Sequence, residues 1–332
     1  MNEKNHENKI WLLLDDRAGN RSQVLGIGKA LGLKYILKNI KYNKLSKFPN
    51  IILQKTIKHI TINDRKQFKP PWPKIIIGCG RKSAPIGRWI KKESNNYSKY
   101  IQIMWPAYPY KDLDLIFTPI HDGINNKTNV INIETSPNII DKNLLYEASI
   151  KWKKKLGLLK QPRIAVIIGG DTKQHKLTST HIKELFTEIK KIINIDTSLM
   201  ITTSRRTSKE AYDKIKEEIH KLNNKSIFWD ISYASPNPYH GYLAYSDIAI
   251  VTGDSVSICS EICATGKPLL IYAPSDITIK KHKLFHNLLI KKGIAQYLKE
   301  AEIQNIKKIQ YQAINESENI AKIIKSKFLK IN

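Results

Sequence analysis

The sequence predicts an α/β protein of two domains, each with a parallel sheet covered by helices, that face each other across a cleft. Short continuous apolar runs alternate with segments of helical periodicity, a pattern typical of parallel sheets buried on both faces. Turns with glycine and small polar residues follow several of these runs, as they do where such sheets bind ligands. The length of 332 residues suits two such domains and a closing helix.

The first domain is expected over residues 1–155. It opens with an apolar strand at residues 10–14, a turn, and a helix at residues 22–31 that Gly32 ends in the position favouring glycine. Further strands are expected at residues 74–78, 100–104 and 113–118, and further helices at residues 86–92 and 143–159.

The second domain is expected over residues 160–310, again with strands and helices in alternation. The predicted strands are residues 163–168, 198–203, 226–230, 248–252 and 269–272, and the predicted helices are residues 179–193, 208–221 and a segment that ends at Ala264. Residues 311–332 are expected to form an amphipathic closing helix, because Ile320, Ile324 and Phe328 recur at helical spacing beside lysines. We expect its apolar side to pack on the body of the protein.

The chain carries 56 Lys and Arg against 29 Asp and Glu, a formal charge of +27. The halves share it evenly, with +13 for residues 1–150 (25 − 12) and +14 for residues 151–332 (31 − 17), and lysine outnumbers arginine 48 to 8. Proteins that bind phosphate backbones favour arginine, whose guanidinium forms two parallel hydrogen bonds to phosphate, so this lysine-rich composition disfavours nucleic acid as a partner. Residues 34–74 are locally basic, with eleven cations, one acid (Asp64) and interleaved apolar residues. That segment suits an anionic membrane leaflet or an ordinary solvated surface equally well.

Other features exclude several classes of protein. No stretch approaches the ~18 apolar residues that a membrane-spanning helix needs, and the first ten residues are polar and carry both charges, unlike a secretory signal. Three cysteines, Cys79, Cys259 and Cys263, cannot form a disulfide framework. We therefore expect a cytoplasmic protein, peripheral at most on the inner face of a membrane. Although His282 and His286 share the spacing of the last two cysteines, no metal site is expected, because cysteine is commonly buried.

Three turns of the second domain suit a nucleoside diphosphate, and each directly follows a predicted strand. They are Gly169-Gly170-Asp171, Thr203-Ser204-Arg205-Arg206 and Thr252-Gly253-Asp254-Ser255-Val256-Ser257. The last turn begins a helix, whose dipole and free N–H groups attract phosphate, and Gly253 is expected in an unusual backbone conformation. Glu261, one turn further on, is placed to take a ribose diol. Neither a dinucleotide fingerprint nor a P-loop is present.

Seven ordered blocks between Trp11 and Gly293 resemble the mitochondrial fission (elongated mitochondria) protein family of bacteria and plants. They read WLLLDDRAGNRSQVLGIGKALG, GCGRKSAPIGRWIK, YIQIMWP, RIAVIIGGDTKQHKL, TTSRRT, NPYHGYLAYSD and VTGDSVSICSEICATGKP. The resemblance implies a GT-B glycosyltransferase-like fold of two Rossmann-like domains. In that fold the C-terminal domain holds a nucleoside-diphosphate sugar, here UDP- or GDP-linked, as a donor substrate and not as a permanent cofactor.

The resemblance also implies the site residues. The implied donor site comprises Gly169, Gly170, Thr203, Ser204, Arg205, Arg206, Asn237, Thr252, Gly253, Asp254, Ser255, Ser257 and Glu261. Arg205 or Arg206 would neutralise the leaving diphosphate in place of a metal. The implied acceptor site, in the first domain, comprises Arg17, Gly19, Gln23, Gly80, Arg81 and Ser83, beside Asp15.

Sugar transfer to a hydroxyl needs a base within ~3 Å of that hydroxyl. The candidates are Asp15, Asp16 and Asp122, with His121 as a substitute. The chain departs from the family in having Asp16 where glycine is usual and Asn20 where histidine is frequent, and asparagine is no base. We favour Asp15, although Asp15 and Asp16 suit a turn after the first strand equally well.

These observations predict a metal-independent glycosyltransferase that acts on an envelope or lipid-linked acceptor. The first alternative is a non-catalytic adaptor with the same fold that works through protein partners at a membrane. The second alternative is a nucleic-acid binder driven by charge, which the even charge distribution disfavours.

Overall fold

The structure, a computed structural model, describes residues 10–125, 127–172, 174–230, 236–306 and 308–329. The prediction that the chain begins without a secretory signal concerns residues 1–9, which lie outside the described range. The chain divides into two compact units: unit 1 is Met1–Ile139 with Asn315–Asn332, and unit 2 is Ile140–Ile314. The sequence analysis placed the division near residues 155–160 and treated the C-terminal segment separately.

Helix α5 (Lys142–Leu156) explains where the division falls, because it packs within unit 2. Its partner is α8 (Tyr239–Tyr245), whose Tyr245 hydroxyl donates a 2.9 Å hydrogen bond to the carbonyl of Ser149. The helices approach so closely that a Cβ on Gly241 would lie 2.5 Å from the Trp152 ring. Leu156, at the end of α5, joins a buried cluster with Ala165 and Met200 of the second sheet.

Unit 1 contains a six-stranded parallel sheet in the order β2-β1-β3-β4-β5-β6. Its strands are β1 (Ile10–Leu14), β2 (Tyr35–Asn39), β3 (Ile75–Cys79), β4 (Lys99–Ile103), β5 (Leu115–Pro119) and β6 (Val130–Ile133). The four inner strands are almost wholly buried, as their continuous apolar sequences predict. The edge strands β2 and β6 are partly exposed and were not predicted.

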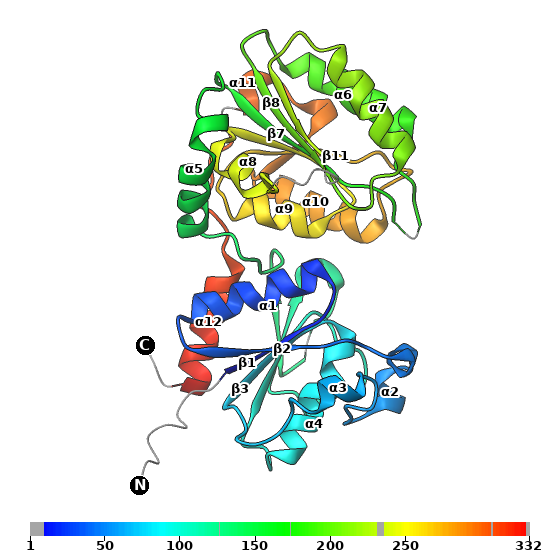
Figure 1. Ribbon diagram of the computed structural model, residues 1–332, viewed down its shortest axis with the longest axis vertical. Helices are drawn as coiled ribbons and strands as arrows, with labels where there is room; N and C mark the ends of the chain where they lie inside the picture. Colours follow the sequence, from blue (N-terminus) through cyan, green and yellow to red (C-terminus); the bar gives the residue numbers. More distant parts are fainter. Residues whose placement is uncertain (1–9, 126, 173, 231–235, 307, 330–332) are drawn as a thin grey trace. The chain divides into compact units, whose positions relative to one another are not determined.

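Helices cover both faces of this sheet (Figure 1). On one face lie α1 (Ala18–Leu31), ended by Gly32 at φ 64° as expected, and α12 (Glu316–Ile324). Ile320 and Ile324 of α12 are fully buried against α1 and the sheet. The apolar side of the closing segment therefore packs within unit 1. The other face carries α2 (Asn50–Leu53), α3 (Ile62–Arg65) and α4 (Ala84–Glu93).

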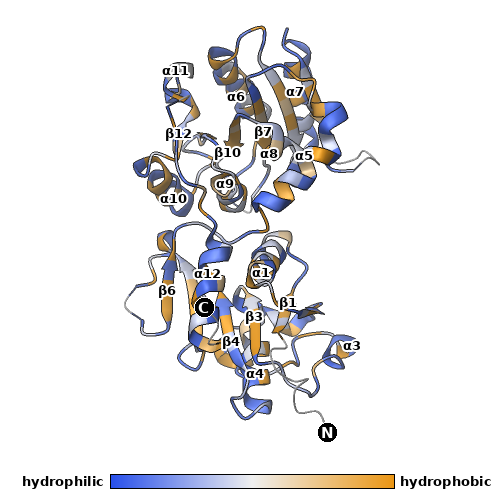
Figure 2. Ribbon diagram, turned by 90° about the vertical axis from the view of Figure 1, so that its left-hand side faces the viewer, coloured by the Kyte–Doolittle hydropathy of each residue, from blue (hydrophilic) through white to orange (hydrophobic). Residues whose placement is uncertain are grey.

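Unit 2 contains a second six-stranded parallel sheet, in the order β12-β11-β10-β7-β8-β9. Its strands are β7 (Arg163–Ile168), β8 (Ser198–Thr203), β9 (Ser226–Trp229), β10 (Ile248–Thr252), β11 (Leu269–Tyr272) and β12 (Ala295–Tyr297). In Figure 2 the inner strands are coloured as hydrophobic, in keeping with their burial.

Helices flank the second sheet on both faces as well (Figure 1). One face carries α6 (Ser179–Ile192) and α7 (Lys209–His220), and the other carries α8, α9 (Val256–Cys263) and α10 (Lys280–Lys291). A short helix, α11 (Ile303–Ile306), follows β12. Among the residues described, no helix has both the length and the apolar character to cross a membrane.

Candidate functional site

Asp254, two residues after the end of β10, links three strand-end turns of unit 2. Its carboxylate accepts hydrogen bonds from the Thr252 hydroxyl at 2.6 Å and from the N–H of Gly170 at 3.4 Å. It also forms a 2.6 Å ion pair with the guanidinium of Arg206, and its side chain is only 6% exposed. Thr252 in turn accepts a 2.7 Å bond from the N–H of Gly169. The turns after β7, β8 and β10 are therefore locked together, as their placement at one sheet edge predicts.

The two glycines after β7 are required by this close packing. A Cβ on Gly169 would lie 2.1 Å from a carboxylate oxygen of Asp254, and one on Gly170 would lie 2.2 Å from the backbone of Arg206. The turn after β8 is closed by Ser204, whose hydroxyl accepts a 3.1 Å bond from the N–H of Arg206. Thr203, just before it, is buried.

The two arginines after β8 differ in what they contact. Arg206 is engaged with Asp254 and also donates to the carbonyl of Asp171 at 3.1 Å. Arg205 is exposed, and within the described part of the chain its side chain has no hydrogen bond or ion pair. The sequence left open which arginine would meet a diphosphate. In the geometry of the turns, Arg206 supports the scaffold and Arg205 is available.

The start of α9 is half-buried and adjoins these turns. Ser255 is its N-cap, and the serine hydroxyl accepts a 3.3 Å bond from the N–H of Ile258. The first N–H groups of a helix lack intrahelical partners, so those of Val256 and Ser257 point out of the helix start. Ser257 itself is half-buried. This arrangement of amides and hydroxyls at a positive helix end suits an anionic ligand.

Glu261 lies further along α9 and is half-buried beside Tyr239, which the sequence did not indicate. The Tyr239 hydroxyl donates a 2.5 Å hydrogen bond to its carboxylate. Burial raises the pKa of Glu261 to about 7, although the bond from Tyr239 opposes that shift. Asn237, two residues before the tyrosine, is exposed and accepts a 2.9 Å bond from the Tyr239 N–H. No local pattern links residues 237–239 to α9, so only the fold reveals this contact.

Gly253 has a different role from the one expected. Its φ lies outside the left-handed region, so no unusual backbone conformation explains the glycine. The reason is close packing, because a Cβ there would lie 2.7 Å from the His286 ring and 2.8 Å from Ala273. His282, one turn before His286, is beside the same turn. Burial lowers the pKa of His282, while the carboxylate of Asp254 and the carbonyl of Gly253 raise it.

Cys259 and Cys263 lie on α9 and are fully buried. Burial raises the pKa of the Cys259 thiol well above its ordinary value. Across the described residues, no group of three or more His, Cys, Asp or Glu side chains is placed to hold a metal ion. The spacing shared with His282 and His286 therefore does not correspond to a metal-ligand cluster.

The strand ends of unit 1 centre on Asp15, which follows β1 and is 5% exposed. One carboxylate oxygen accepts a 2.8 Å bond from the Asn20 amide, and the other accepts a 3.1 Å bond from the N–H of Arg17. Burial raises the pKa of Asp15, and these two bonds oppose that shift. Asp15 thus closes the turn before α1. Asp16 and Arg17 beside it are exposed.

Of the acceptor residues implied by the resemblance, several are engaged in the fold of unit 1. Arg81 donates to the carbonyls of Phe48 at 2.7 Å and Ser46 at 2.8 Å. The Ser83 hydroxyl donates to the Gly80 carbonyl at 2.9 Å and is 2% exposed.

Besides Arg17, the other residues of the implied acceptor site are Gly19, Gln23 and Gly80. Gly80 has φ 77°, which favours glycine, and its N–H donates to the carbonyl of Ile103 at 2.9 Å. Gln23 is buried with its amide 3.9 Å from the Met104 sulfur, and Gly19 lies in the first turn of α1. A Cβ on Gly80 would lie 3.1 Å from the amide of Asn20, which donates to Asp15, and none of these three residues carries a charge.

Asp122 lies apart from Asp15. It follows β5, which is three strands from β1 in the sheet, a separation of about 14 Å at ~4.8 Å per strand. Its carboxylate is 3.8 Å from the ring of His121, and both side chains are nearly buried. The three candidate bases thus fall into two places: Asp15 and Asp16 at the end of β1, and Asp122 with His121 at the end of β5.

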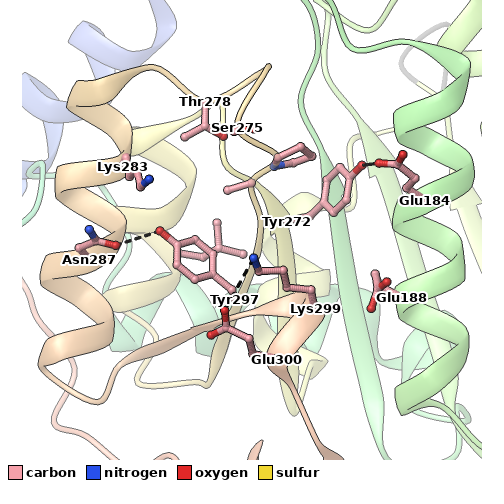
Figure 3. A pocket seen from close by; sticks show the side chains of 13 residues that line it. Glu184, Glu188, Tyr272, Ser275, Thr278, Lys283, Asn287, Tyr297, Lys299 and Glu300 are labelled. Carbon is pink, nitrogen blue, oxygen red and sulfur yellow. Dashed lines mark hydrogen bonds and ion pairs between the residues drawn. The ribbon is translucent and has the colours of Figure 1, made fainter.

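Unit 2 also holds a cavity of about 660 Å³ that no sequence pattern indicated. Figure 3 shows it between the helix bearing Lys283 and Asn287 and the helix bearing Glu184 and Glu188. Tyr297 donates to Asn287 and Tyr272 donates to Glu184, both at 3.0 Å. A separate small recess borders the turn cluster at Gly170, Thr172, His175 and Asp254.

Solved structures share this architecture at low sequence identity. A MurG from Acinetobacter baumannii matches with a TM-score of 0.58 and 10% identity, over 96% of this chain and 99% of that one. The UDP-GlcNAc 2-epimerase of Methanocaldococcus jannaschii matches with a TM-score of 0.57 and 13% identity, over 96% and 99%. MnaA of S. aureus, solved with UDP, matches with a TM-score of 0.54 and 13% identity, over 98% of each chain. The chain therefore has a GT-B-like fold, with two parallel α/β sheets.

Sequence comparison gives the family. Residues 18–328 match the model of the family described as "Mitochondrial fission ELM1", and the chain belongs to that family. An uncharacterised protein, RP120, of Rickettsia prowazekii (strain Madrid E) is 32% identical over 97% of this chain and 99% of its own length. The mitochondrial fission protein ELM1 of Arabidopsis thaliana is 27% identical over 66% of this chain and 56% of its own length. The resemblance seen in the seven blocks is confirmed.

Proposed function

We propose that the protein is a metal-independent glycosyltransferase that uses a nucleoside-diphosphate sugar, UDP- or GDP-linked, as donor. One observation carries the proposal: at the half-buried start of α9, Ser255 and the first N–H groups of the helix lie beside the linked turns of unit 2. The proteins of similar fold include MnaA in complex with UDP and a UDP-GlcNAc 2-epimerase from Neisseria meningitidis bound to UDP-GlcNAc. A UDP-type ligand is thus compatible with this fold.

In the proposed donor complex the diphosphate binds at the start of α9. The N–H groups of Val256 and Ser257 and the hydroxyl of Ser257 would donate to its oxygens, and exposed Arg205 would supply the positive charge. Glu261 would accept hydrogen bonds from the ribose hydroxyls once it is ionised. Asn237 lies two residues before Tyr239, which donates to Glu261. Arg206 and Asp254 would hold the turns without contacting the ligand, because they are already paired with each other.

In the proposed reaction, the acceptor hydroxyl oxygen forms a bond to the anomeric carbon of the sugar. The bond from that carbon to the diphosphate oxygen breaks, and the leaving diphosphate keeps the electron pair. Asp15 takes the hydroxyl proton, and its raised pKa makes it a stronger base than an exposed aspartate. The two bonds that it already accepts leave further lone pairs on its oxygens.

The acceptor is proposed to be part of the envelope or linked to a lipid, and the protein to work at the cytoplasmic face of a membrane. The locally basic segment of unit 1, with its exposed apolar side chains, supports this location. Unit 1 would bind the acceptor near Asp15, Asp16 and Arg17.

Calorimetric titration with UDP, GDP and their sugars tests donor binding. The matched pair is Arg205→Ala and Arg206→Ala. We expect Arg205→Ala to weaken nucleotide binding about tenfold or more, as the loss of a charge-assisted contact does, at unchanged melting temperature. Arg206→Ala should lower the melting temperature instead. If no nucleotide binds, or if Ser255→Ala and Glu261→Ala behave like the wild type, donor binding is refuted.

A second candidate is a non-catalytic adaptor that keeps the fold and acts through protein partners. Two observations favour it: both oxygens of Asp15 already accept hydrogen bonds, and Asn20 takes the place where the family often has histidine. Partner capture that survives Ser255→Ala, Glu261→Ala and Asp15→Asn together would support the adaptor. Sugar transfer that Asp15→Asn abolishes while nucleotide binding remains would support the enzyme.

A further inference from the structure

The docking segment, residues 41–58 of unit 1, combines exposed apolar side chains with lysines. Leu45, Phe48, Ile51 and Ile52 are 42%, 47%, 62% and 63% exposed. Four large apolar residues exposed within eight positions form a local cluster, unlike the isolated surface apolar residues that most proteins have. We propose that this segment docks the protein on a membrane surface rich in anionic lipid. The proposal deepens the proposed function by naming where a lipid-linked acceptor is met.

The segment is held in this orientation by polar contacts beneath it. Ser46, Asn50 and Leu53 point inward and are 3%, 1% and 8% exposed. The Asn50 amide donates to the carbonyls of Arg81 at 2.9 Å and Pro106 at 2.8 Å. Arg81 donates back to the carbonyls of Ser46 and Phe48. The exposed apolar side chains are therefore the outward side of an anchored element, and insertion into lipid needs no refolding.

The charge around these side chains matches an anionic surface. Lys41, Lys44, Lys47, Lys55 and Lys58 are all exposed, and the segment has no acidic residue. Among residues 34–74, the one acid is Asp64, which accepts a 2.7 Å bond from the Lys41 N–H. From outside the segment, Asp112 pairs with Lys55 at 3.2 Å. The remaining four lysines lie in the same segment as the apolar cluster, and a lysine near an anionic bilayer adds roughly fivefold to binding.

The composition favours lipid over other partners. Protein interfaces are depleted in lysine and enriched in arginine and aromatic residues, whereas the docking segment contains lysine and no arginine. Single-stranded nucleic acid is bound by stacking on aromatic rings, but the most exposed of the large apolar side chains here are isoleucines. Aliphatic side chains bordered by lysines are the composition of elements that lie in the membrane interface.

Vesicle co-sedimentation of the full chain tests the proposal, with phosphatidylcholine vesicles and with vesicles of phosphatidylcholine and phosphatidylglycerol at 7:3. We expect binding to the anionic vesicles that weakens with salt and is at least tenfold weaker on the neutral ones. The double variant Ile51→Ser/Ile52→Ser should bind the anionic vesicles at least tenfold more weakly. The matched control is Leu158→Ser/Ile195→Ser, which alters unit 2 side chains that are 79% and 70% exposed, and it should bind normally.

Two charge-reversal variants, one in the docking segment and one outside it, distinguish local docking from attraction by the overall positive charge of the protein. Lys44→Glu/Lys47→Glu should reduce binding at least tenfold, and Lys153→Glu/Lys154→Glu on α5 should leave it within twofold. Equal losses in the two charge variants, equal binding to both vesicles, or normal binding by the isoleucine variant would each overturn the proposal. Nucleotide titration of the same variants should be unchanged. If nucleotide fails to bind but vesicle docking follows this pattern, only the proposed function falls.

Discussion

The residues of the turns after β7, β8 and β10 of unit 2 divide into two groups, one that holds the turns together and one that is available to a ligand. Thr252, Asp254 and Arg206 bond mainly to one another and to the turn after β7, and these bonds fix three strand ends. Arg205 and Ser255 lie at the surface of that set and have capacity to bind. A motif of glycine, serine, threonine and aspartate thus contains its own scaffold, so only some of its members are expected to contact a ligand.

The raised pKa of Glu261 predicts how the free energy of unfolding depends on pH. Its folded pKa of about 7 exceeds its ordinary value of 4.5, so the folded state holds the proton more tightly than the unfolded state does. The free energy of unfolding should therefore fall as pH rises from about 4.5 to about 7, by about 3 kcal/mol, and not further above. Denaturation of wild type and Glu261→Gln across this range isolates the effect, because glutamine does not titrate.

If Glu261 binds the ribose hydroxyls, the affinity for UDP should also depend on pH. An ionised carboxylate accepts from a diol without a proton of its own, so UDP affinity should rise as pH increases through about 7 in the wild type. Glu261→Gln should show a flat profile over the same range. Parallel profiles for the two proteins would mean that another group titrates, and would remove Glu261 from the ribose site.

How far the site could be predicted depends on whether its residues are local in sequence. The run from Thr252 to Glu261 follows a strand and enters a helix, so spacing alone indicated it. Tyr239 and His282 come from α8 and α10, and no pattern connects them to α9. The role of Gly253 was wrong for a related reason, since a close approach to His286 and Ala273 cannot be seen in the chain itself.

At the scale of elements, the length of the continuous apolar run decided which strands were predictable, and the edge strand β9 with its run Ile227–Trp229 was among them. The inner strands, such as β3 and β10, are continuous apolar runs, and their predicted bounds lie within two residues of the observed ones. The edge strand β2 is exposed at most positions and β12 has three residues, so neither gives a clear signal. Helix α10 was missed although its buried Phe285 and Leu289 are four residues apart.

Helix α12 is an element whose role only tertiary structure reveals, because it completes the core of unit 1 from the far end of the chain. Ile324→Ala should lower the free energy of unfolding by about 3 kcal/mol, since it leaves a cavity against α1. Lys322→Ala, on the exposed side of the same helix, should change it by less than about 0.5 kcal/mol.

Hydrogen exchange locates the effect of that substitution. Amides of β1 and β3 should exchange faster in Ile324→Ala, while those of β7 and β10 should not change, because α12 belongs to unit 1. Faster exchange confined to unit 2 would contradict this assignment.

At the scale of the whole molecule, the charge of +27 explains less than its size suggests. It is divided evenly between the two halves, and the feature with structural meaning is its local combination with exposed apolar side chains in residues 41–58. The length proved informative, because two six-stranded sheets and a closing helix use nearly the whole chain.

The proposed nucleotide site at the turns of unit 2 has an alternative in the 660 Å³ cavity of the same unit, and hydrogen exchange with and without UDP distinguishes the two. We expect slower exchange at the turns 169–171, 204–207 and 252–258, because a diphosphate at the start of α9 would order those amides. Amides beside the 660 Å³ cavity, at Asn287 and Tyr297, should be unchanged. Slower exchange only at the amides beside the cavity would mean that UDP binds in the cavity, and that Arg205 and Ser255 do not contact it. Protection at the turns alone would leave the cavity as a separate site, which Arg205→Ala should not affect.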